Sequence, residues 1–186
     1  GLGCEDKYHN VPGADDYTYS IQTLSKARET FHKISELPAG SKVGIVGAGL
    51  SGIELASELR ESRKDIQIIL YDRGERILRN FPEKLSNYIA TWFKKHDVTV
   101  VPNSTIDGVE PGKIYNNGQP EDVDLVVWTA GIQPVEIVRN LPIDINRSGR
   151  VIVNQYHQIP TYTNVFVVGD CADLPHAPSA QLAELQ

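Results

Sequence analysis

One stretch of the chain, from Val43 to Ala56, restricts the possible folds more than any other. It begins as an apolar run rich in β-branched residues, passes through three glycines and continues with helix-forming residues. Gly47, Gly49 and Gly52 have the spacing G-x-G-x-x-G. In this motif the first glycine allows a tight turn, the second lets a phosphate approach the backbone, and the third brings helix and strand together. Because a helix start also attracts anions, the stretch predicts a strand–turn–helix unit that binds a pyrophosphate.

The residues after this turn favour a dinucleotide as the ligand. A second apolar run, 66–71, ends at Asp72, which lies 20 residues after Gly52. At that place a carboxylate receives the ribose hydroxyls of an adenosine. An acidic residue favours NAD over NADP, whereas the adjacent Arg73 can face a 2′-phosphate. The alternative is a βαβ unit whose glycine-rich turn holds no ligand.

Composition excludes several classes of function. The 186 residues carry a formal net charge of −6 at pH 7, which gives no basic surface for nucleic acid. No apolar run approaches the roughly 20 residues that span a membrane, and no signal peptide is visible at the N-terminus. Cys4 and Cys171 belong to no C-x-x-C pattern, so we expect reduced thiols, no metal site and a cytoplasmic location. The chain begins at Gly1 and has no methionine, so we expect it to be a piece of a longer protein.

Hydrophobic periodicity predicts a Rossmann-like α/β fold with a parallel sheet. Apolar residues at helical spacing in 24–36, with Thr23 as N-cap, predict a helix before the glycine motif. A later helix is predicted from Phe81-Pro82-Glu83 onwards, followed by a strand at 98–101. The order βαβαβ is that of a mononucleotide-binding half. One face of the later helix carries a stripe that we expect to pack on the sheet. The stripe consists of Leu85, Ile89, Trp92, Phe93 and His96.

The pattern then changes to short strands. Residues 106–110 and 113–115 predict an antiparallel β insert where a fully wound Rossmann fold would have a helix. A further buried strand, 124–128, leads into Thr129-Ala130-Gly131. Since ligands lie at the carboxyl ends of parallel strands, we expect Gly131 to allow close approach of a ligand to the backbone. Its alternative role is that of a turn glycine.

The last part of the chain predicts two short strands and a helix. Residues 151–153 and 165–168 are apolar and β-branched, and the second run ends in Gly169-Asp170. We expect the second run to be buried, which would position Asp170 for a sugar or ribityl hydroxyl. Residues 180–186 have the pattern of a helix start.

Taken in this order, the motifs resemble those of the two-dinucleotide-binding flavoproteins, the pyridine-nucleotide-dependent FAD oxidoreductases of the glutathione-reductase fold. Within that group the chain is similar to the type II NADH dehydrogenases, which are NADH:quinone oxidoreductases. The narrower resemblance rests on Gly1-Leu2-Gly3 before the Pro12-Gly13 turn, on Gly52-Ile53-Glu54-Leu55-Ala56, on Gly169-Asp170-Cys171-Ala172 and on Ala180-Gln181.

This resemblance implies an enzyme and its cofactors. NADH would stack on FAD and transfer a hydride, and the electrons would pass on to quinone. Such chemistry belongs to the cofactors, while the protein supplies orientation and electrostatics. The turn 47–52, which includes Leu50 and Ser51, would bind the pyrophosphate of NADH, and Asp72 would bind the adenosine ribose.

The resemblance also implies roles for residues outside the turn. Ala130 and Gly131 would lie beside the nicotinamide half, and Asp170 would bind the ribityl chain of FAD. Two residues are candidate catalytic groups: Glu54, near nicotinamide and flavin, and Gln181, near the flavin edge where quinone arrives. The alternative for Glu54 is a charge on the solvated face of the helix.

A division of the chain follows from the resemblance. No second G-x-G-x-x-G, which would bind the ADP half of FAD, occurs in the sequence. Residues 1–22 would then be a remnant of the FAD domain or a linker, 23–140 the NAD(H)-binding domain and 141–186 a partial second segment of the FAD domain. We expect this chain to bind NAD(H) weakly, to bind FAD poorly or not at all, and to need its longer parent for activity. That parent would be peripheral on the cytoplasmic face of the membrane. The segment after 140 would be less ordered than the rest, or stabilised in a homodimer.

Two other functions stay open. The chain can be the NAD(P)H domain of a soluble relative, such as a ferredoxin or disulfide reductase. Disulfide reductases carry their redox cysteine pair in the first FAD segment, and Cys4 and Cys171 match neither position. A free-standing NAD-binding sensor module is the other function, and it requires that the two chain ends are natural.

Overall fold

The computed structural model describes residues 2–175 and 183–184. Its contacts divide the chain into two compact units, one formed by residues 8–131 and the other by 1–7 together with 132–186. The predicted domain boundaries after residues 22 and 140 concern which cofactor each segment serves. Contacts do not test that assignment, so the boundaries stay a prediction.

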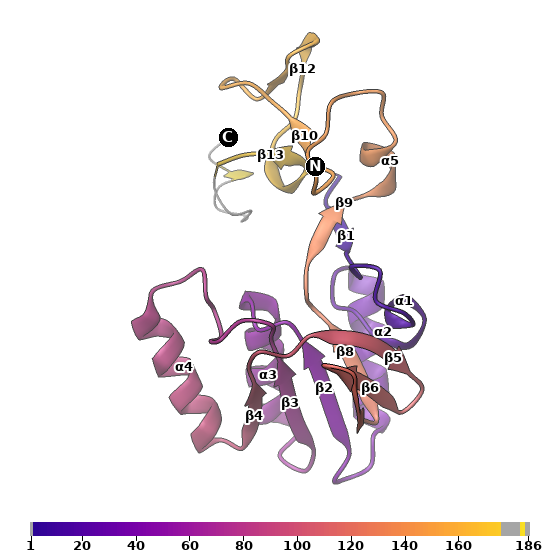
Figure 1. Ribbon diagram of the computed structural model, residues 1–186, viewed down its shortest axis with the longest axis vertical. Helices are drawn as coiled ribbons and strands as arrows, with labels where there is room; N and C mark the ends of the chain where they lie inside the picture. The colour runs from indigo at the N-terminus through magenta and orange to yellow at the C-terminus, as the bar shows by residue number, and fades with distance from the viewer. Residues whose placement is uncertain (1, 176–182, 185–186) are drawn as a thin grey trace. The chain divides into compact units, whose positions relative to one another are not determined.

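The unit 8–131 is built on a parallel sheet of four strands. These are β2 (Lys42–Val46), β3 (Gln67–Tyr71), β4 (Val98–Val101) and β8 (Leu125–Trp128). Their order across the sheet is β4-β3-β2-β8, and every neighbouring pair is parallel (Figure 1). An order in which the first strand lies inside the sheet and later strands add on both sides is typical of the Rossmann fold. The predicted α/β class is therefore confirmed.

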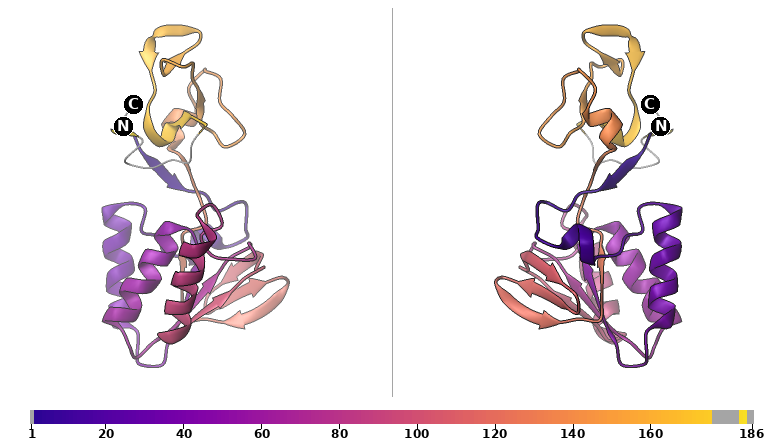
Figure 2. Two further views of the ribbon diagram at one scale, coloured as in Figure 1. Left: turned by 90° about the vertical axis from the view of Figure 1, so that its left-hand side faces the viewer. Right: turned by 90° about the vertical axis from the view of Figure 1, so that its right-hand side faces the viewer.

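Three helices cover one face of this sheet (Figure 2). They are α2 (Leu24–Glu36), α3 (Leu50–Ser62) and α4 (Glu83–Lys95). The predicted N-cap of α2 is confirmed, because the Thr23 hydroxyl accepts a hydrogen bond from the Lys26 amide at 3.3 Å. Alternate residues of each strand point to the helices, as the pleat of a sheet requires. The cluster between them includes Ile34, Val43, Ile45, Ile53, Ile68, Leu70, Phe93 and Val127.

The predicted stripe of α4 packs on the sheet only in part. The prediction is confirmed for Phe93, which is fully buried, and for Ile89 and Trp92, which pack against the core, but not for Leu85, which is 38% exposed. The helix presents Ser86 to the interior in place of Leu85, because the Ser86 hydroxyl donates a hydrogen bond to the Ile77 carbonyl at 2.7 Å. Farther along α4, the Trp92 ring lies near the edge of the core.

A small antiparallel sheet and a short helix cover the other face. The sheet consists of β5 (Ile106–Glu110), β6 (Lys113–Asn116) and β7 (Gln119–Asp122), and the helix is α1 (Ala14–Tyr17). The predicted β insert is therefore confirmed, and its apolar side takes the place of a helical layer. The parallel sheet contributes its remaining side chains to this second core: Val46, Tyr71, Val126 and Trp128.

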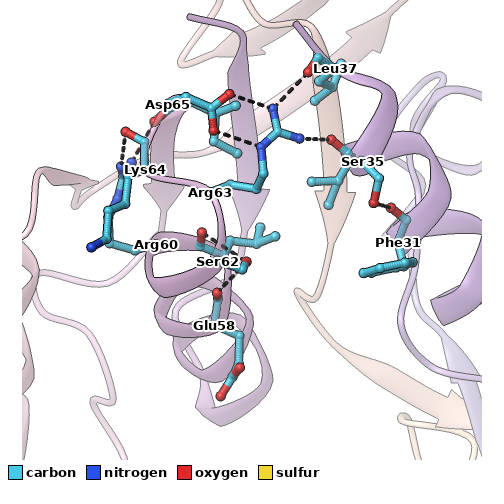
Figure 3. A network of polar contacts seen from close by, with 12 residues as sticks. Phe31, Ser35, Leu37, Glu58, Arg60, Ser62, Arg63, Lys64 and Asp65 are labelled. Atoms are coloured by element: carbon cyan, nitrogen blue, oxygen red, sulfur yellow. Dashed lines mark hydrogen bonds and ion pairs between the residues drawn. The ribbon is translucent and has the colours of Figure 1, made fainter. Parts of the chain in front are cut away.

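An arginine clamp joins α2 to the end of α3 (Figure 3). The Arg63 guanidinium donates hydrogen bonds to the Ile34 carbonyl at 2.6 Å and to the Leu37 carbonyl at 2.8 Å. It also pairs with both carboxylate oxygens of Asp65, at 2.8 and 2.9 Å. This bidentate pair is charge-assisted and geometrically specific. The Arg63 hydrogen bond lowers the pKa of the Asp65 carboxyl from its ordinary value of 3.8.

The second unit is made of two-stranded pairs. β1 (Cys4–Asp6) pairs antiparallel with β9 (Ile132–Pro134), and the segment after β9 includes α5 (Glu136–Arg139). In this unit the Glu5 carboxylate accepts hydrogen bonds from Gln133 and from Arg139. The remaining elements are β10 (Val151–Ile152) with β13 (Ala172–Asp173), and β11 (Gln158–Ile159) with β12 (Tyr162–Phe166).

The predicted buried strand before Asp170 is wrong in two respects. The strand is β12, which ends at Phe166, and it is exposed along its length, with Phe166 61% exposed. The physical reason is that β12 has β11 as its partner in a two-stranded sheet, which cannot cover both faces of a strand. Asp170 lies in a short 3₁₀ turn, Gly169–Cys171. The helix predicted from residue 180 falls largely outside the described residues.

Both cysteines are free and buried, and both lie in this second unit. The Cys171 thiol donates to the Gly3 carbonyl at 3.3 Å. Burial, with Asp170 nearby, raises the pKa of Cys4 to about 11. A thiol with such a pKa is protonated at neutral pH and is a poor nucleophile.

We expect Arg63→Ala to lower the midpoint of thermal unfolding, because it leaves the carbonyls of Ile34 and Leu37 and the Asp65 carboxylate without this donor. Asp65→Asn should lower the midpoint less, because it keeps the two carbonyl bonds. Since the folded state lowers the pKa of Asp65, the unfolded state binds the proton more tightly, and the pair stabilises above the ordinary carboxyl pKa. The effect of Asp65→Asn should therefore vanish as pH falls through the folded pKa. Calorimetric scans between pH 7 and pH 3 measure this, with Lys64→Ala as the control, and an effect that does not change with pH would contradict it.

Candidate nucleotide-binding site

A cavity of about 560 Å³ lies at the carboxyl ends of β2, β3 and β8 in the unit 8–131. Parallel α/β sheets bind their ligands at this edge. The cavity is lined by the turn after β2, by residues that follow β3 and by residues that follow β8. Six of the residues predicted from the sequence are brought together around it: Gly47, Gly49, Asp72, Arg73, Ala130 and Gly131.

The three motif glycines each meet a different steric requirement. Gly47 has φ +106°, and a Cβ there would lie 2.9 Å from the Ala130 Cα. A Cβ on Gly52 would lie 1.9 Å from the Gly47 carbonyl oxygen, so any side chain would push α3 off the turn. Beside Gly49, by contrast, a Cβ would meet no protein atom within 4 Å. Its bare backbone therefore borders open space, as a phosphate site requires.

The start of α3 adds hydrogen-bond donors to this turn. The helix begins at Leu50, and its N-cap, Gly49, supplies no side-chain hydrogen bond. The first N–H groups of a helix have no partner within the helix. They also carry the positive end of the helix dipole, so the turn suits an anion such as a pyrophosphate.

Asp72 is held rigidly beside the turn. One carboxylate oxygen accepts the Ala48 amide at 2.7 Å, and the other accepts the Gly74 amide at 2.7 Å. A carboxylate has about four acceptor positions, so each oxygen keeps one more. Two free acceptor positions on a fixed, half-buried carboxylate match the two hydroxyls of a ribose.

At the opposite side of the cavity the backbone after β8 is fixed by two side chains. The Thr129 hydroxyl lies 2.9 Å from the Val46 carbonyl and 3.0 Å from the Gly47 carbonyl. His9 Nε2 lies 2.7 Å from the Ala130 carbonyl, to which it donates because a carbonyl only accepts. His9 was not predicted, since it is 121 residues from Ala130 in the sequence and belongs to no motif. His9 and Thr129 thus fix the backbone after β8 next to the glycine turn.

Arg79 is a second cavity residue that sequence reasoning missed. It lies seven residues after Asp72, whereas a motif search looks for a basic residue directly beside the acid. The signal that could have found it is the basic character of 73–79, which contains three arginines.

Several predicted residues do not line this cavity. Leu50, Ser51 and Glu54 lie on α3 with exposed side chains. Asp170 belongs to the other unit. Gln181 lies outside the described residues.

Two features are absent from the part of the chain that the structure describes. In it, no group of three His, Cys, Asp or Glu side chains is arranged to hold a metal ion. Over the same residues, no helix combines the length and the apolar character that crossing a bilayer requires.

Curated relatives resemble this chain in sequence. The chain is 56% identical over 186 residues to the NADH dehydrogenase-like protein YutJ of Bacillus subtilis (strain 168), a match that covers 100% of this chain and 52% of that protein. It is 29% identical over 147 residues to the type II NADH:quinone oxidoreductase of Haemophilus influenzae, covering 71% of this chain and 33% of that protein. The chain thus spans about half the length, or less, of these curated relatives.

Solved structures share the fold. The water-forming NADH oxidase of Lactobacillus brevis bound to NADH superposes with a TM-score of 0.83 at 19% identity, over 97% of this chain and 42% of that one. NDH2 of Plasmodium falciparum in complex with NADH superposes with a TM-score of 0.74 at 19% identity, over 91% of this chain and 42% of that one. At these identities the likeness shows the fold alone, and it confirms the predicted Rossmann-like FAD/NAD(P)-binding fold.

The family model of the pyridine nucleotide-disulphide oxidoreductases matches residues 1–184. The match spans both compact units and includes the glycine turn and Asp72. The chain therefore belongs to the pyridine nucleotide-disulphide oxidoreductase family, as its motifs predicted.

Proposed function

We propose that this chain is the NADH-binding part of a flavin-dependent NADH dehydrogenase, in which hydride passes from NADH to FAD and electrons pass on to quinone. The observation that carries the proposal is the geometry of Asp72. Its fixed carboxylate has two free acceptor positions and lies in one cavity with the bare turn at Gly49. A ribose and a pyrophosphate are adjacent groups in NADH, so both ends of the site match one ligand.

In this proposal each wall of the cavity binds one part of NADH. Asp72 receives the adenosine ribose, and the N–H groups at the start of α3 bind the pyrophosphate above Gly49. The nicotinamide half extends towards Ala130 and Gly131, where His9 holds the backbone in place. The protein thereby orients the nicotinamide.

The described residues fit NAD(H) better than they fit FAD. For FAD they offer Asp170, in a 3₁₀ turn where its carboxylate can accept a ribityl hydroxyl. The sequence has one G-x-G-x-x-G, and the cavity uses it. FAD supplies the hydride acceptor when it is bound in the longer protein. Quinone reduction near Gln181, a peripheral position on the cytoplasmic face of the membrane and a homodimer are further parts of the proposal.

We expect Asp72→Asn to weaken NADH binding ten- to hundredfold, because hydrogen bonds to a charged group contribute about 1.5–3 kcal/mol. Calorimetric titration of the purified chain with NADH measures the change, and a parallel titration with FAD should give no signal. Asp97→Asn is the matched control, since Asp97 is an exposed carboxylate that does not line the cavity. Tight FAD binding would mean that the Gly47 turn serves the flavin, which would reject the assignment.

Alanine substitutions at Gly49 and Gly52 should have different effects, one on NADH binding and the other on stability. Gly49→Ala adds a methyl group where no protein atom lies within 4 Å, so the chain should fold and lose NADH affinity. Gly52→Ala adds a methyl group 1.9 Å from the Gly47 carbonyl oxygen, so the unfolding temperature should fall markedly. Thermal melts and NADH titrations of both variants distinguish the two roles. Unchanged NADH affinity in a folded Gly49→Ala chain would argue against a phosphate at this turn.

Glu54 is proposed as a proton or positioning group for the nicotinamide in the complete enzyme. In this chain its side chain is exposed on α3, away from the cavity walls. Glu54→Gln removes the titrating carboxyl at nearly constant shape, so the pH–rate profile of the full-length enzyme should shift. A profile identical to that of the unaltered enzyme would reject the role and leave Glu54 as a solvated charge.

A further inference from the structure

The two cysteines of the chain lie close together, although one is near its start and the other near its end. Cys4 belongs to β1, and Cys171 is the last residue of the 3₁₀ turn Gly169–Cys171. The Cys171 sulfur lies 3.3 Å from the Gly3 carbonyl oxygen. Because a peptide oxygen is about 3 Å from the Cα of the next residue, this sulfur lies within about 6 Å of the Cys4 Cα.

The backbone around both cysteines is held in place by strand pairing within their unit. β1 pairs with β9, where Cys4 is opposite Pro134, and β9 also contacts the 3₁₀ turn. Directly after the turn, Ala172 pairs with Val151. The two buried thiols therefore belong to one packed body, and neither has to leave its element to approach the other.

The approach of the two residues is compatible with a disulfide bond. Such a bond joins cysteines whose Cα atoms are about 4.4–6.8 Å apart. Rotation about the Cα–Cβ bond moves each sulfur, while the backbone stays where it is. The Cys171 thiol is held by a hydrogen bond to the Gly3 carbonyl, and a thiol is a weak donor. Closing the bond therefore costs one weak hydrogen bond and leaves the strand pairs intact.

The surroundings of the two thiols favour a bond that forms slowly and resists reduction. Burial, together with the charges of Asp170 and Cys171, raises the pKa of Cys4 to about 11. Burial also raises the pKa of Cys171. Formation is slow at neutral pH, because the thiolate is the nucleophile. A disulfide is strongly oxidising when its reduced form is stabilised, and a buried thiolate receives no such stabilisation.

We propose that Cys4 and Cys171 form an intramolecular disulfide when the protein meets hydrogen peroxide, an oxidant small enough to reach buried sulfur atoms. One thiolate attacks a peroxide oxygen, the O–O bond breaks, and the products are a sulfenic acid and a hydroxide ion, which takes up the proton that the thiol lost. The second thiol attacks the sulfenic sulfur, the S–O bond breaks, and the oxygen leaves as water with the second proton. Two thiols thereby lose two electrons and two protons, and one peroxide is reduced to two waters.

The bond would tie the turn that carries Asp170 to β1. It would also close a loop of nearly the whole chain, and a cross-link over a long loop restricts the unfolded state most. Neither cysteine lines the nucleotide cavity, so the inference stands apart from the proposed function.

The test is treatment of the purified chain with hydrogen peroxide, followed by alkylation of the remaining thiols in denaturant and mass spectrometry. The chain should lose two hydrogen atoms and bind no alkylating reagent, and proteolysis should release one peptide pair that joins Cys4 to Cys171. Dithiothreitol should restore both thiols. The rate should rise about tenfold per pH unit between pH 7 and pH 9, because the thiolate fraction of a thiol with a pKa of about 11 rises in that proportion.

Two matched variants and one unfolded control show whether the folded chain brings the sulfur atoms together. Cys4→Ser and Cys171→Ser should each gain oxygen on the remaining cysteine in place of losing two hydrogen atoms. In concentrated urea, where nearly the whole chain separates the two cysteines, linking within one chain should slow. Equally fast linking in urea would overturn the inference.

Other results would also overturn it. One is that both cysteines of the peroxide-treated chain still react with the alkylating reagent. Another is that the links join different chains, which non-reducing gels show as dimers. The oxidised chain should also unfold at a higher temperature than the reduced chain. A lower midpoint would mean that the folded chain does not accommodate the bond.

Discussion

The close approach of α3 to the end of β2 is the constraint on which the site depends. At Gly52 no Cβ fits, because the Gly47 carbonyl oxygen and the Thr129 hydroxyl would lie 1.9 and 2.8 Å away. This approach places the start of α3 directly after the turn that lines the cavity. It also brings the backbone after β8 against the turn, where the Thr129 hydroxyl contacts the Val46 and Gly47 carbonyls. The absence of a side chain at Gly52 therefore lets the start of α3, the glycine turn and the backbone after β8 lie close together.

Asp72 connects this turn to the loop that follows β3. Its carboxylate holds the Ala48 amide in the turn and the Gly74 amide in the next loop. The Leu78 amide returns from that loop to the Ala48 carbonyl. The loop and the turn are thus one hydrogen-bonded assembly, which holds Asp72 and the backbone of Arg79 beside the cavity. The Asp72 side chain is itself part of this assembly, whereas Arg79 contributes only its backbone carbonyl to it.

Much of the unit 8–131 was predictable because its signals are local. Strand, glycine turn and helix follow each other within 20 residues of Val43, and the β insert is signalled by short strands. Burial was harder to predict, since it depends on partners that sequence does not specify. On α4, Ser86 is buried and its hydroxyl donates a hydrogen bond to the Ile77 carbonyl, whereas Leu85 is exposed. Phe166 is exposed because β12 pairs only within a two-stranded sheet.

The sequence by itself determined the Rossmann-like class, the glycine turn and the place of Asp72 directly after the second strand, because glycine sterics and hydrophobic periodicity act over a few residues. Only the tertiary structure decided that His9 supports Ala130, 121 residues away, and that Arg76 braces the loop while Arg79 is left free at the cavity. The three arginines of that loop are alike in sequence. They differ in the structure, because the Arg76 guanidinium donates its hydrogen bonds to backbone carbonyls, whereas the Arg79 side chain lines the cavity and remains available to a ligand.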